Sequence, residues 1–315
     1  MAAGRVAVLC GGVGAARFLA GLVQVVDEAS ITAIVNTGDD SVMHGLTICP
    51  DLDTITYTLS GSVNPETGWG LAGETWQAME TLERLGGSER TWFRLGDRDL
   101  GTHLHRTGRL AEGASLSEVT AEIASAFGLR LRLLPMTDDP VRTVLSASGR
   151  QLPFQEYFVK LRHAVVVDGV HFEGASSAVP APGVVEAIES AEVVVVAPSN
   201  PIVSIGPILA VKGVEAALAA RRQSVVAVSP IVGGAALKGP ADRLLEELGG
   251  SASADGVARH LAHVVGTLVI DEVDGGLAGA VEAAGVHAVV TRTVMSSAEI
   301  ARDLATTVLR SGRDQ

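Results

Sequence analysis

The chain has 315 residues, of which 47% are hydrophobic, so it is long enough to form one large α/β domain or about two smaller ones. Its formal net charge is −12 and it contains no block of Lys and Arg, which argues against a nucleic-acid-binding surface. The two cysteines, Cys10 and Cys49, lack the spacing of a zinc site or a disulfide framework, and neither a signal peptide nor a membrane span is evident, so we expect a soluble cytoplasmic protein.

Short apolar runs alternate with helical patterns along most of the chain. Unbroken Val-rich runs of this kind are typical of strands that are buried on both faces of a parallel sheet. The predicted strands are residues 6–10, 31–36, 193–197, 225–229, 267–271 and 287–291, and the predicted helices are residues 15–26, 206–220, 240–248, 254–265 and 297–309. This alternation predicts a Rossmann-like, doubly wound, mostly parallel sheet.

The middle of the chain departs from this rhythm. Helices are predicted at residues 51–60, 74–85, 97–107 and 117–127, and further strands at 131–135, 142–147 and 163–169. Ser115 and Glu118 have the spacing of a capping box, which would satisfy free N–H groups where the last of these helices begins. We therefore predict a nucleotide-binding core of residues 1–54 and 131–315, with a mainly helical insertion at 55–130.

Four aspartates follow the second predicted strand within fifteen residues: Asp39, Asp40, Asp51 and Asp53. Side chains past the carboxyl end of a parallel strand lie where α/β sheets bind ligands. Carboxylates so close together repel one another unless they share a cation, and hard oxygen ligands suit Mg²⁺, which usually accompanies phosphates. The alternative is a solvated acidic loop in which Asp51 caps the following helix.

A glycine turn, Gly11-Gly12-Val13-Gly14, joins the first predicted strand to a helix. Glycines let a backbone approach a phosphate closely, and a helix N-terminus offers free N–H groups. The spacing matches neither GxGxxG nor a P-loop, so a plain tight turn remains an alternative.

Three further motifs offer polar groups to a ligand. Arg98, in Gly96-Asp97-Arg98-Asp99, could bind a phosphate or a polar ring, or belong to a capped surface turn. His103 and His105 are two residues apart and are interpreted as surface histidines. Ser199 with Asn200, and Ser229 with Lys238, follow buried strands and could contact a nucleotide or a phosphate, although N-capped turns would also explain them.

Together these motifs resemble the 2-phospho-L-lactate transferase family of coenzyme F420 biosynthesis (CofD/FbiA type), and they cover nearly the whole chain in the expected order. The segments that carry the resemblance are CGGVGAARFLAGL, NTGDD, CPDLDT, GWG…ET, LGDRDLGTHL, LLPMTDDPVRT, FQEYFV, APSNPIVSIGPIL and SPIVGG…KGPAD.

The resemblance implies a Mg²⁺-dependent transfer in a dimeric enzyme. The donor would be a GDP-activated three-carbon acid, either phosphoenolpyruvate or 2-phospho-L-lactate, with phosphoenolpyruvate favoured by the Ala-, Gly- and Val-rich composition. The acceptor would be the deazaflavin FO (7,8-didemethyl-8-hydroxy-5-deazariboflavin), whose terminal ribityl hydroxyl attacks phosphorus and releases GMP. The product would be dehydro-F420-0 or F420-0.

The resemblance also implies residue roles. The metal site would be formed by Asp39, Asp40, Asp51 and Asp53. Asp53 or Asp51 would orient or deprotonate the hydroxyl, and Arg98 would contact FO in a site partly formed by the insertion. The donor would be held by Gly11, Gly12, Gly14, Asn36, Ser199, Asn200 and Ser229.

Two other functions are weighed against the transferase. A non-catalytic nucleotide-sugar-binding regulator of the same fold would not need the PDLDT and GDRDLGTH segments that are present here. A nicotinamide-dependent oxidoreductase would need GxGxxG and an acidic residue at the end of the second strand, where this chain has Asn36.

Overall fold

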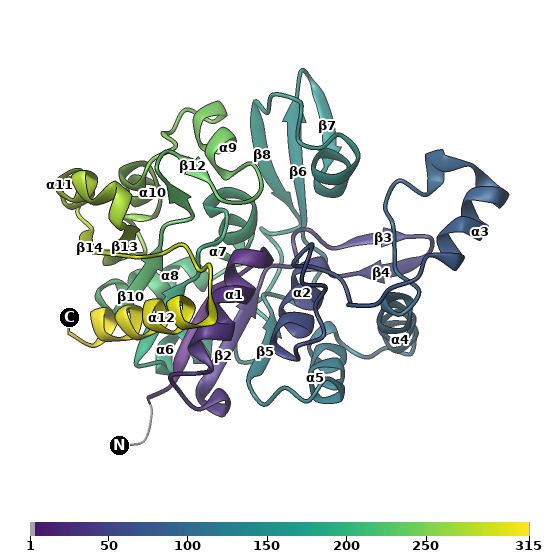
Figure 1. Cartoon of the computed structure of the whole chain (residues 1–315), viewed down its shortest axis with the longest axis horizontal. Helices are drawn as coiled ribbons and strands as arrows, with labels where there is room; N and C mark the ends of the chain where they lie inside the picture. Colours follow the sequence, from purple (N-terminus) through teal and green to yellow (C-terminus); the bar gives the residue numbers. More distant parts are fainter. Residues whose placement is uncertain (1–3, 315) are drawn as a thin grey trace.

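The computed structural model describes residues 4–314, which form a seven-stranded parallel sheet with helices on both faces (Figure 1). The strand order is β14-β13-β10-β9-β1-β2-β5, and every neighbouring pair is parallel. The strands are β1 (Val6–Cys10), β2 (Ile31–Val35), β5 (Arg132–Pro135), β9 (Val193–Val196), β10 (Val225–Val228), β13 (Thr267–Asp271) and β14 (His287–Thr291). The predicted Rossmann-like, doubly wound fold class is confirmed.

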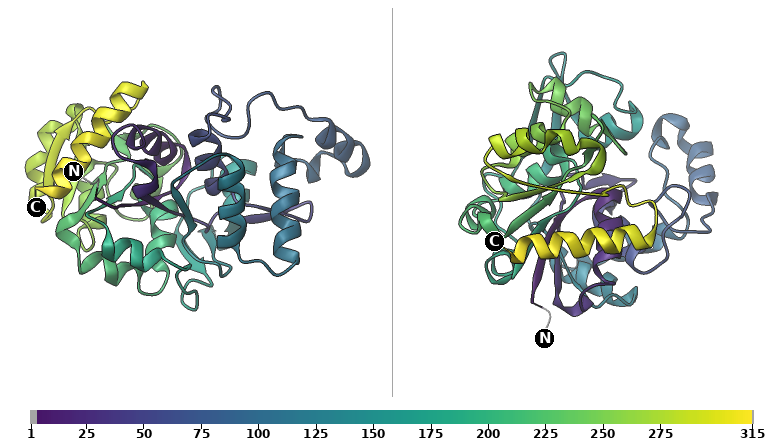
Figure 2. Two further views of the ribbon diagram at one scale, coloured as in Figure 1. Left: turned by 90° about the horizontal axis from the view of Figure 1, so that it is seen from below. Right: turned by 60° about the vertical axis from the view of Figure 1, so that its left-hand side comes forward.

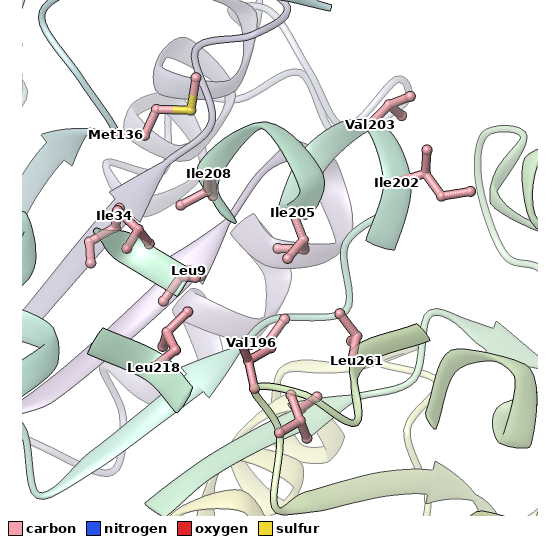
Figure 3. Close-up of a cluster of buried hydrophobic side chains, with 14 of the residues drawn as sticks. Leu9, Ile34, Met136, Val196, Ile202, Val203, Ile205, Ile208, Leu218 and Leu261 are labelled. Carbon is pink, nitrogen blue, oxygen red and sulfur yellow. The ribbon is translucent and has the colours of Figure 1, made fainter. Parts of the chain in front are cut away.

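Alternation along the strands divides the hydrophobic core between the two faces of the sheet. In β1, Val6, Val8 and Cys10 join one cluster, whereas Ala7 and Leu9 join the other. The first cluster is covered by α1 (Gly12–Leu22), α2 (Pro50–Leu59), α5 (Leu116–Ala126) and α12 (Ala298–Arg313). The second is covered by α6 (Val184–Ser190), α7 (Gly206–Ala210), α8 (Val214–Ala219) and α10 (Ala254–Leu261). Figure 3 shows Ile208 of α7, Leu218 of α8 and Leu261 of α10 in this cluster with Leu9, Ile34 and Val196 of the strands.

The strand order reverses between β1 and β9, so the loops that follow these two strands open a crevice at the carboxyl edge of the sheet. The two loops are bonded together through Ser199. Its hydroxyl accepts the N–H of Gly11 at 3.2 Å and donates to the Gly11 carbonyl at 2.9 Å. The predicted ligand-binding edge is therefore a fixed junction of two loops.

The segment between α2 and β5 extends from one end of the molecule (Figures 1 and 2). It contains α3 (Gln77–Gly86), α4 (Asp99–Ala111) and α5, and it encloses a small apolar cluster around Ile48, Met79 and Leu95. A hairpin that the sequence did not predict, β3 (Ser41–Met43) with β4 (Leu46–Ile48), precedes α2. The predicted capping box at Ser115 and Glu118 is confirmed. The domain boundaries themselves stay a prediction.

A second, antiparallel sheet lies beside the core in the order β7-β6-β8. The predicted strand at 142–147 is confirmed as β6 (Arg142–Ala147), which pairs with β7 (Arg150–Pro153) and β8 (Gly169–Glu173).

The strand predicted at 163–169 is wrong. Side chains of α9 (Ala241–Glu247), rather than a neighbouring strand, form the hydrogen bonds with the backbone of this segment. The Arg243 guanidinium donates to the carbonyls of His163 and Val165, and the Glu247 carboxylate accepts the Val167 N–H at 2.9 Å.

The single helix predicted at 206–220 is also wrong in part. The chain forms a π-helical turn at Pro201–Ile205, then α7, and breaks before α8 at Gly213, whose φ of 89° favours glycine.

The remaining elements are α11 (Ala278–Ala283), β11 (Ile231–Val232), β12 (Ala235–Ala236), four short 3₁₀ turns (Glu28–Ser30, Ser88–Arg90, Arg222–Ser224, Glu272–Leu277) and a π-helical turn at Glu156–Lys160. Within residues 4–314, no helix combines the length and apolar character needed to cross a membrane.

Gly21 allows α1 to lie directly against α12. A Cβ at this position would overlap the backbone of Ala301, so Gly21→Ala should destabilise the fold by about 1–3 kcal/mol through overpacking. Gly108 lies at an exposed position of α4, where an added Cβ meets no atom within 4 Å. Gly108→Ala should therefore stabilise the fold by about 0.5–1 kcal/mol. Urea unfolding of both variants measures the difference, and equal midpoints would contradict the assigned contact.

Candidate active site

The glycine turn closes on the loops after β2 and β9. Gly12 has a φ of 75°, which favours glycine, and a Cβ on Gly11 would lie 2.6 Å from the Asp51 carboxylate. A Cβ on Gly14 would overlap the carbonyl of Pro198. Of the three glycines predicted to bind the donor, Gly11 and Gly14 therefore let the neighbouring loops approach closely, and Gly12 lets the backbone turn.

Asp51 faces the glycine turn rather than its own helix. Its carboxylate accepts the Gly12 N–H at 2.8 Å and the Asn36 amide at 3.0 Å, while the Asn36 carbonyl oxygen accepts the Gly38 N–H at 2.8 Å. The expectation that Asp51 caps α2 is wrong, because Cys49 occupies the N-cap position and the Asp51 side chain is engaged across the crevice. Burial raises the pKa of Asp51 to about 6.

Asp39 and Asp40 lie on the loop after β2, which is held by the neighbouring antiparallel sheet. The Thr143 N–H donates to the Gly38 carbonyl at 2.7 Å, and the Gln155 amide donates to the Asp39 carbonyl at 2.9 Å. Burial, and then the nearby Asp51 carboxylate, raise the pKa of Asp39 well above its usual range. Burial also raises the pKa of Asp40.

Several buried oxygens on and around this loop have no hydrogen-bond partner within the described residues. They are Thr37 Oγ1, Asp39 Oδ1, Asp40 Oδ1, Ser41 Oγ and Thr143 Oγ1. A buried polar atom without a partner is costly, so these oxygens are available to a bound ligand. Because they are hard oxygen ligands beside buried carboxylates, they fit Mg²⁺.

Asp53 is paired with a buried arginine. Arg106 of α4 donates to both of its carboxylate oxygens, and His103 Nδ1 lies 3.8 Å from Asp53 Oδ2. The interpretation of His103 as a surface residue is wrong, because only 1% of its surface is exposed. His105, by contrast, is exposed and bonds to Glu122.

Arg98 is exposed at the start of α4, away from these carboxylates. Its guanidinium donates to the Ala72 carbonyl, and its backbone N–H donates to Glu74 at 2.7 Å. Glu74 thus caps α4, and Asp97 caps α3 in return by accepting from the N–H groups of Gln77 and Ala78. The interpretation of Asp97–Asp99 as part of a capped turn is confirmed, whereas contact of Arg98 with FO stays a prediction.

The polar residues after β9 and β10 lie at the same edge but already have partners. The Ser199 hydroxyl is bonded to Gly11, and the Asn200 carbonyl oxygen caps the π-helical turn by accepting from Ile202 and Val203. The Ser229 hydroxyl bonds to the backbone of Ile231. Their predicted contacts with guanosine stay predictions.

Two features of the site escaped the sequence analysis. The first is Arg106, the only buried Lys or Arg among the described side chains. Its spacing of seven residues from Asp99 could have predicted that both residues lie on one face of α4. The second is a hydrogen bond beside the glycine turn, in which the Lys238 ammonium donates to the Thr67 carbonyl at 3.0 Å. Burial, and then nearby Arg17, lower the pKa of Lys238.

Comparison with known proteins gives consistent matches along the chain. The family described as 2-phospho-L-lactate transferase CofD matches residues 6–291. A phosphoenolpyruvate transferase of Streptomyces griseus is 45% identical over 90% of each chain, and one of Kitasatospora aureofaciens is 44% identical over 97% of each. A crystal structure of a UPF0052 family member from Bacillus halodurans covers 98% of this chain and 99% of that one, with a TM-score of 0.64 and 18% identity.

The fold and the site define an α/β enzyme of the transferase class, as predicted. The chain belongs to the 2-phospho-L-lactate transferase CofD family, so the predicted resemblance and the place in coenzyme F420 biosynthesis are confirmed. The Bacillus halodurans structure, at 18% identity, supports the fold alone.

The metal-free protein should lose stability as pH rises, because the pKa of Asp51, about 6, lies above its ordinary 3.8. Between these values the folded state holds a proton that the unfolded state has lost, so the stabilisation falls as pH rises through about 6. Mg²⁺ should therefore raise the melting temperature more at about pH 7 than at about pH 5.

Thermal unfolding at both pH values, with and without Mg²⁺, tests this expectation. The control is Asp51→Asn, which should reduce the dependence of stability on pH. A Mg²⁺ effect that is equal at both pH values in the unchanged protein would count against the buried carboxylate site.

Proposed function

We propose that this chain transfers a phosphoenolpyruvyl group from enolpyruvyl-diphospho-5′-guanosine to the terminal ribityl hydroxyl of FO, with Mg²⁺, giving dehydro-F420-0 and GMP. The names of the Streptomyces griseus and Kitasatospora aureofaciens relatives support phosphoenolpyruvate over 2-phospho-L-lactate as the carried acid. The homodimer and the cytoplasmic location remain predictions from the sequence.

The observation that carries the proposal is the buried pair Asp39 and Asp51 at the switch point of the sheet. Both carboxylates are at least nine-tenths buried, and the Asp51 carboxylate disfavours ionisation of Asp39. Arg106, the only buried Lys or Arg among the described side chains, is engaged with Asp53. A divalent cation would neutralise the pair, and the orphaned oxygens around it match its ligand preference. Asp39 and Asp51 are therefore the residues that would hold Mg²⁺.

The chemistry needs stabilisation of negative charge as the hydroxyl oxygen bonds to phosphorus and the bond to GMP breaks. Mg²⁺, when bound, supplies charge neutralisation to the phosphate oxygens. We assign acceptance of the hydroxyl proton to Asp51, one of the two carboxylates predicted for this role, because its hydrogen-bond partners are neutral, whereas Arg106 holds Asp53 in an ion pair.

Two exposed cations support a phosphate site on the other side of the glycine turn. Lys238 Nζ and Val13 Cγ1 each lie 3.2 Å from the position of a Cβ on Gly68, and Arg17 is close enough to lower the pKa of Lys238. Repulsion between the two cations is relieved when an anion lies between them. Lys238 and Arg17 would thus face the phosphates of the donor, and Arg98 would face FO.

The decisive experiment incubates the protein with FO, Mg²⁺ and either activated donor, and identifies the products by mass. The expected products are GMP and dehydro-F420-0 from the enolpyruvyl donor. Asp39→Asn and Asp51→Asn should each lower kcat roughly 100-fold or more, because the charge that holds the cation is lost. The surface variant Asp303→Asn on α12 is the matched control and should leave turnover unchanged. The proposal would be refuted if no product formed with either of the two donors.

Arg98→Ala should weaken FO binding about 10-fold or more while changing kcat less, since hydrogen bonds from a charged group contribute to holding the ligand. FO fluorescence titration measures this effect in the presence of Mg²⁺ and GDP. Arg84→Ala, an exposed arginine on α3, is the control. A normal titration by the Arg98 variant would remove this residue from the FO site.

A further inference from the structure

A buried ionic network joins α2 to α4 directly behind the carboxylates of the site. Arg106 is 1% exposed and Asp53 5%, and the guanidinium bonds to both carboxylate oxygens. His103 completes the inner layer, since its Nδ1 lies 3.3 Å from Arg106 Nη1. Bidentate pairing of this kind fixes both position and orientation of the carboxylate.

A second layer extends the network along both helices. His103 Nε2 lies 3.4 Å from Asp99 Oδ2, and the Tyr57 hydroxyl donates to Asp99 Oδ1 at 2.5 Å. Asp53 and Tyr57 are four residues apart on α2, as are Asp99 and His103 on α4, so each pair lies on one face of its helix. The network therefore holds the first turn of α2 against α4 at several points.

Asp53, Asp99 and His103 could in principle hold a metal ion of their own, because their ligand atoms lie within 4.8 Å of one another. However, Arg106 already neutralises Asp53, and its guanidinium would repel a second cation. The arrangement is better explained as a set of counter-ions that determines where Asp53 and its neighbours lie.

The position of Asp53 determines that of Asp51, because the two residues share the first turn of α2. With Asp53 held towards α4, Asp51 faces the Gly12 N–H and the Asn36 amide on the opposite side. If the ion pair were broken, the first turn of α2 would lose its attachment to α4, and Asp51 would no longer be held in place through this turn.

We propose that Arg106 is a positioning residue for the cation site: through its ion pair with Asp53 it fixes the turn that presents Asp51 to Asp39. This inference rests on the proposed Mg²⁺ site. It assigns Arg106 no contact with substrate, and it replaces the predicted role of Asp53 as a metal ligand with an indirect one.

The test compares Arg106→Gln, Arg106→Lys and the double variant Asp53→Leu/Arg106→Met with the control Arg109→Gln. Arg109 lies one turn further along α4 but pairs with Glu112 and Glu122 at the surface. Three quantities are measured on the whole protein: Mn²⁺ affinity without substrates, kcat and KM separately, and the melting temperature.

Arg106→Gln should weaken Mn²⁺ binding about 10- to 100-fold, as is typical when a residue supporting a metal ligand is lost, and lower kcat more than it raises KM. Arg106→Lys should recover part of the affinity, because it keeps the charge but loses the planar fork. The double variant removes both charges, so it should recover the melting temperature without recovering Mn²⁺ affinity or kcat. Arg109→Gln should change none of the three.

Recovery of Mn²⁺ affinity and kcat together with the melting temperature in the double variant would overturn the proposal, because a packing role would then suffice. Unchanged Mn²⁺ affinity in Arg106→Gln would overturn it as well. If Arg106→Gln does not fold, the lysine and double variants decide. Failure of the unchanged protein to bind Mn²⁺ would instead refute the cation site on which both proposals rest, and is distinguished by that first measurement.

Discussion

Charge balance at the carboxyl ends of β1 and β2 is the constraint on which the rest of the site depends. Three carboxylates are buried there, those of Asp39, Asp51 and Asp53, and Arg106 is the only Lys or Arg buried with them among the described side chains. Burial disfavours an ionised carboxylate unless it is paired or hydrogen-bonded. Asp53 has its cation and Asp51 has two N–H donors, whereas Asp39 retains a buried oxygen without a partner. The fold thus leaves Asp39 without a counter-ion among the described residues, and this is the charge that the proposed Mg²⁺ would neutralise.

The sheet topology makes such a concentration of charge possible. Strand order reverses between β1 and β9, so backbone N–H groups from separate loops converge on the same edge. Gly11 has no Cβ, which allows the Asp51 carboxylate to lie against the turn and accept the N–H of Gly12. The same contact engages a backbone donor that the sequence analysis assigned to a phosphate. The glycine turn therefore supports the carboxylate, and in the proposed function the donor phosphate lies beside Lys238.

The sequence predicted those features of the fold that depend on the local pattern of residues. Val-rich runs defined the parallel strands, and the spacing of Ser115 and Glu118 defined a helix start. It could not predict features that depend on distant partners. The run at 163–169 has the composition of a strand, but Arg243 and Glu247 from α9 take its backbone bonds. Likewise, the four aspartates were recognisable as a group, but only the packing of α2 on α4 separates Asp53 from the others.

Helix α4 connects the two ends of the proposed reaction. Arg106 in its interior anchors the carboxylate cluster, and Arg98 at its start is exposed, eight residues or roughly 12 Å away along the axis. Glu74 and Asp97 cap α4 and α3 reciprocally, which fixes the start of the helix as firmly as the ionic network fixes its interior. In the proposed reaction, the ring system of the acceptor would lie at Arg98 and its polyol chain would reach Asp51. Because α4 is held at both points, the span between them is set by the protein before the acceptor binds.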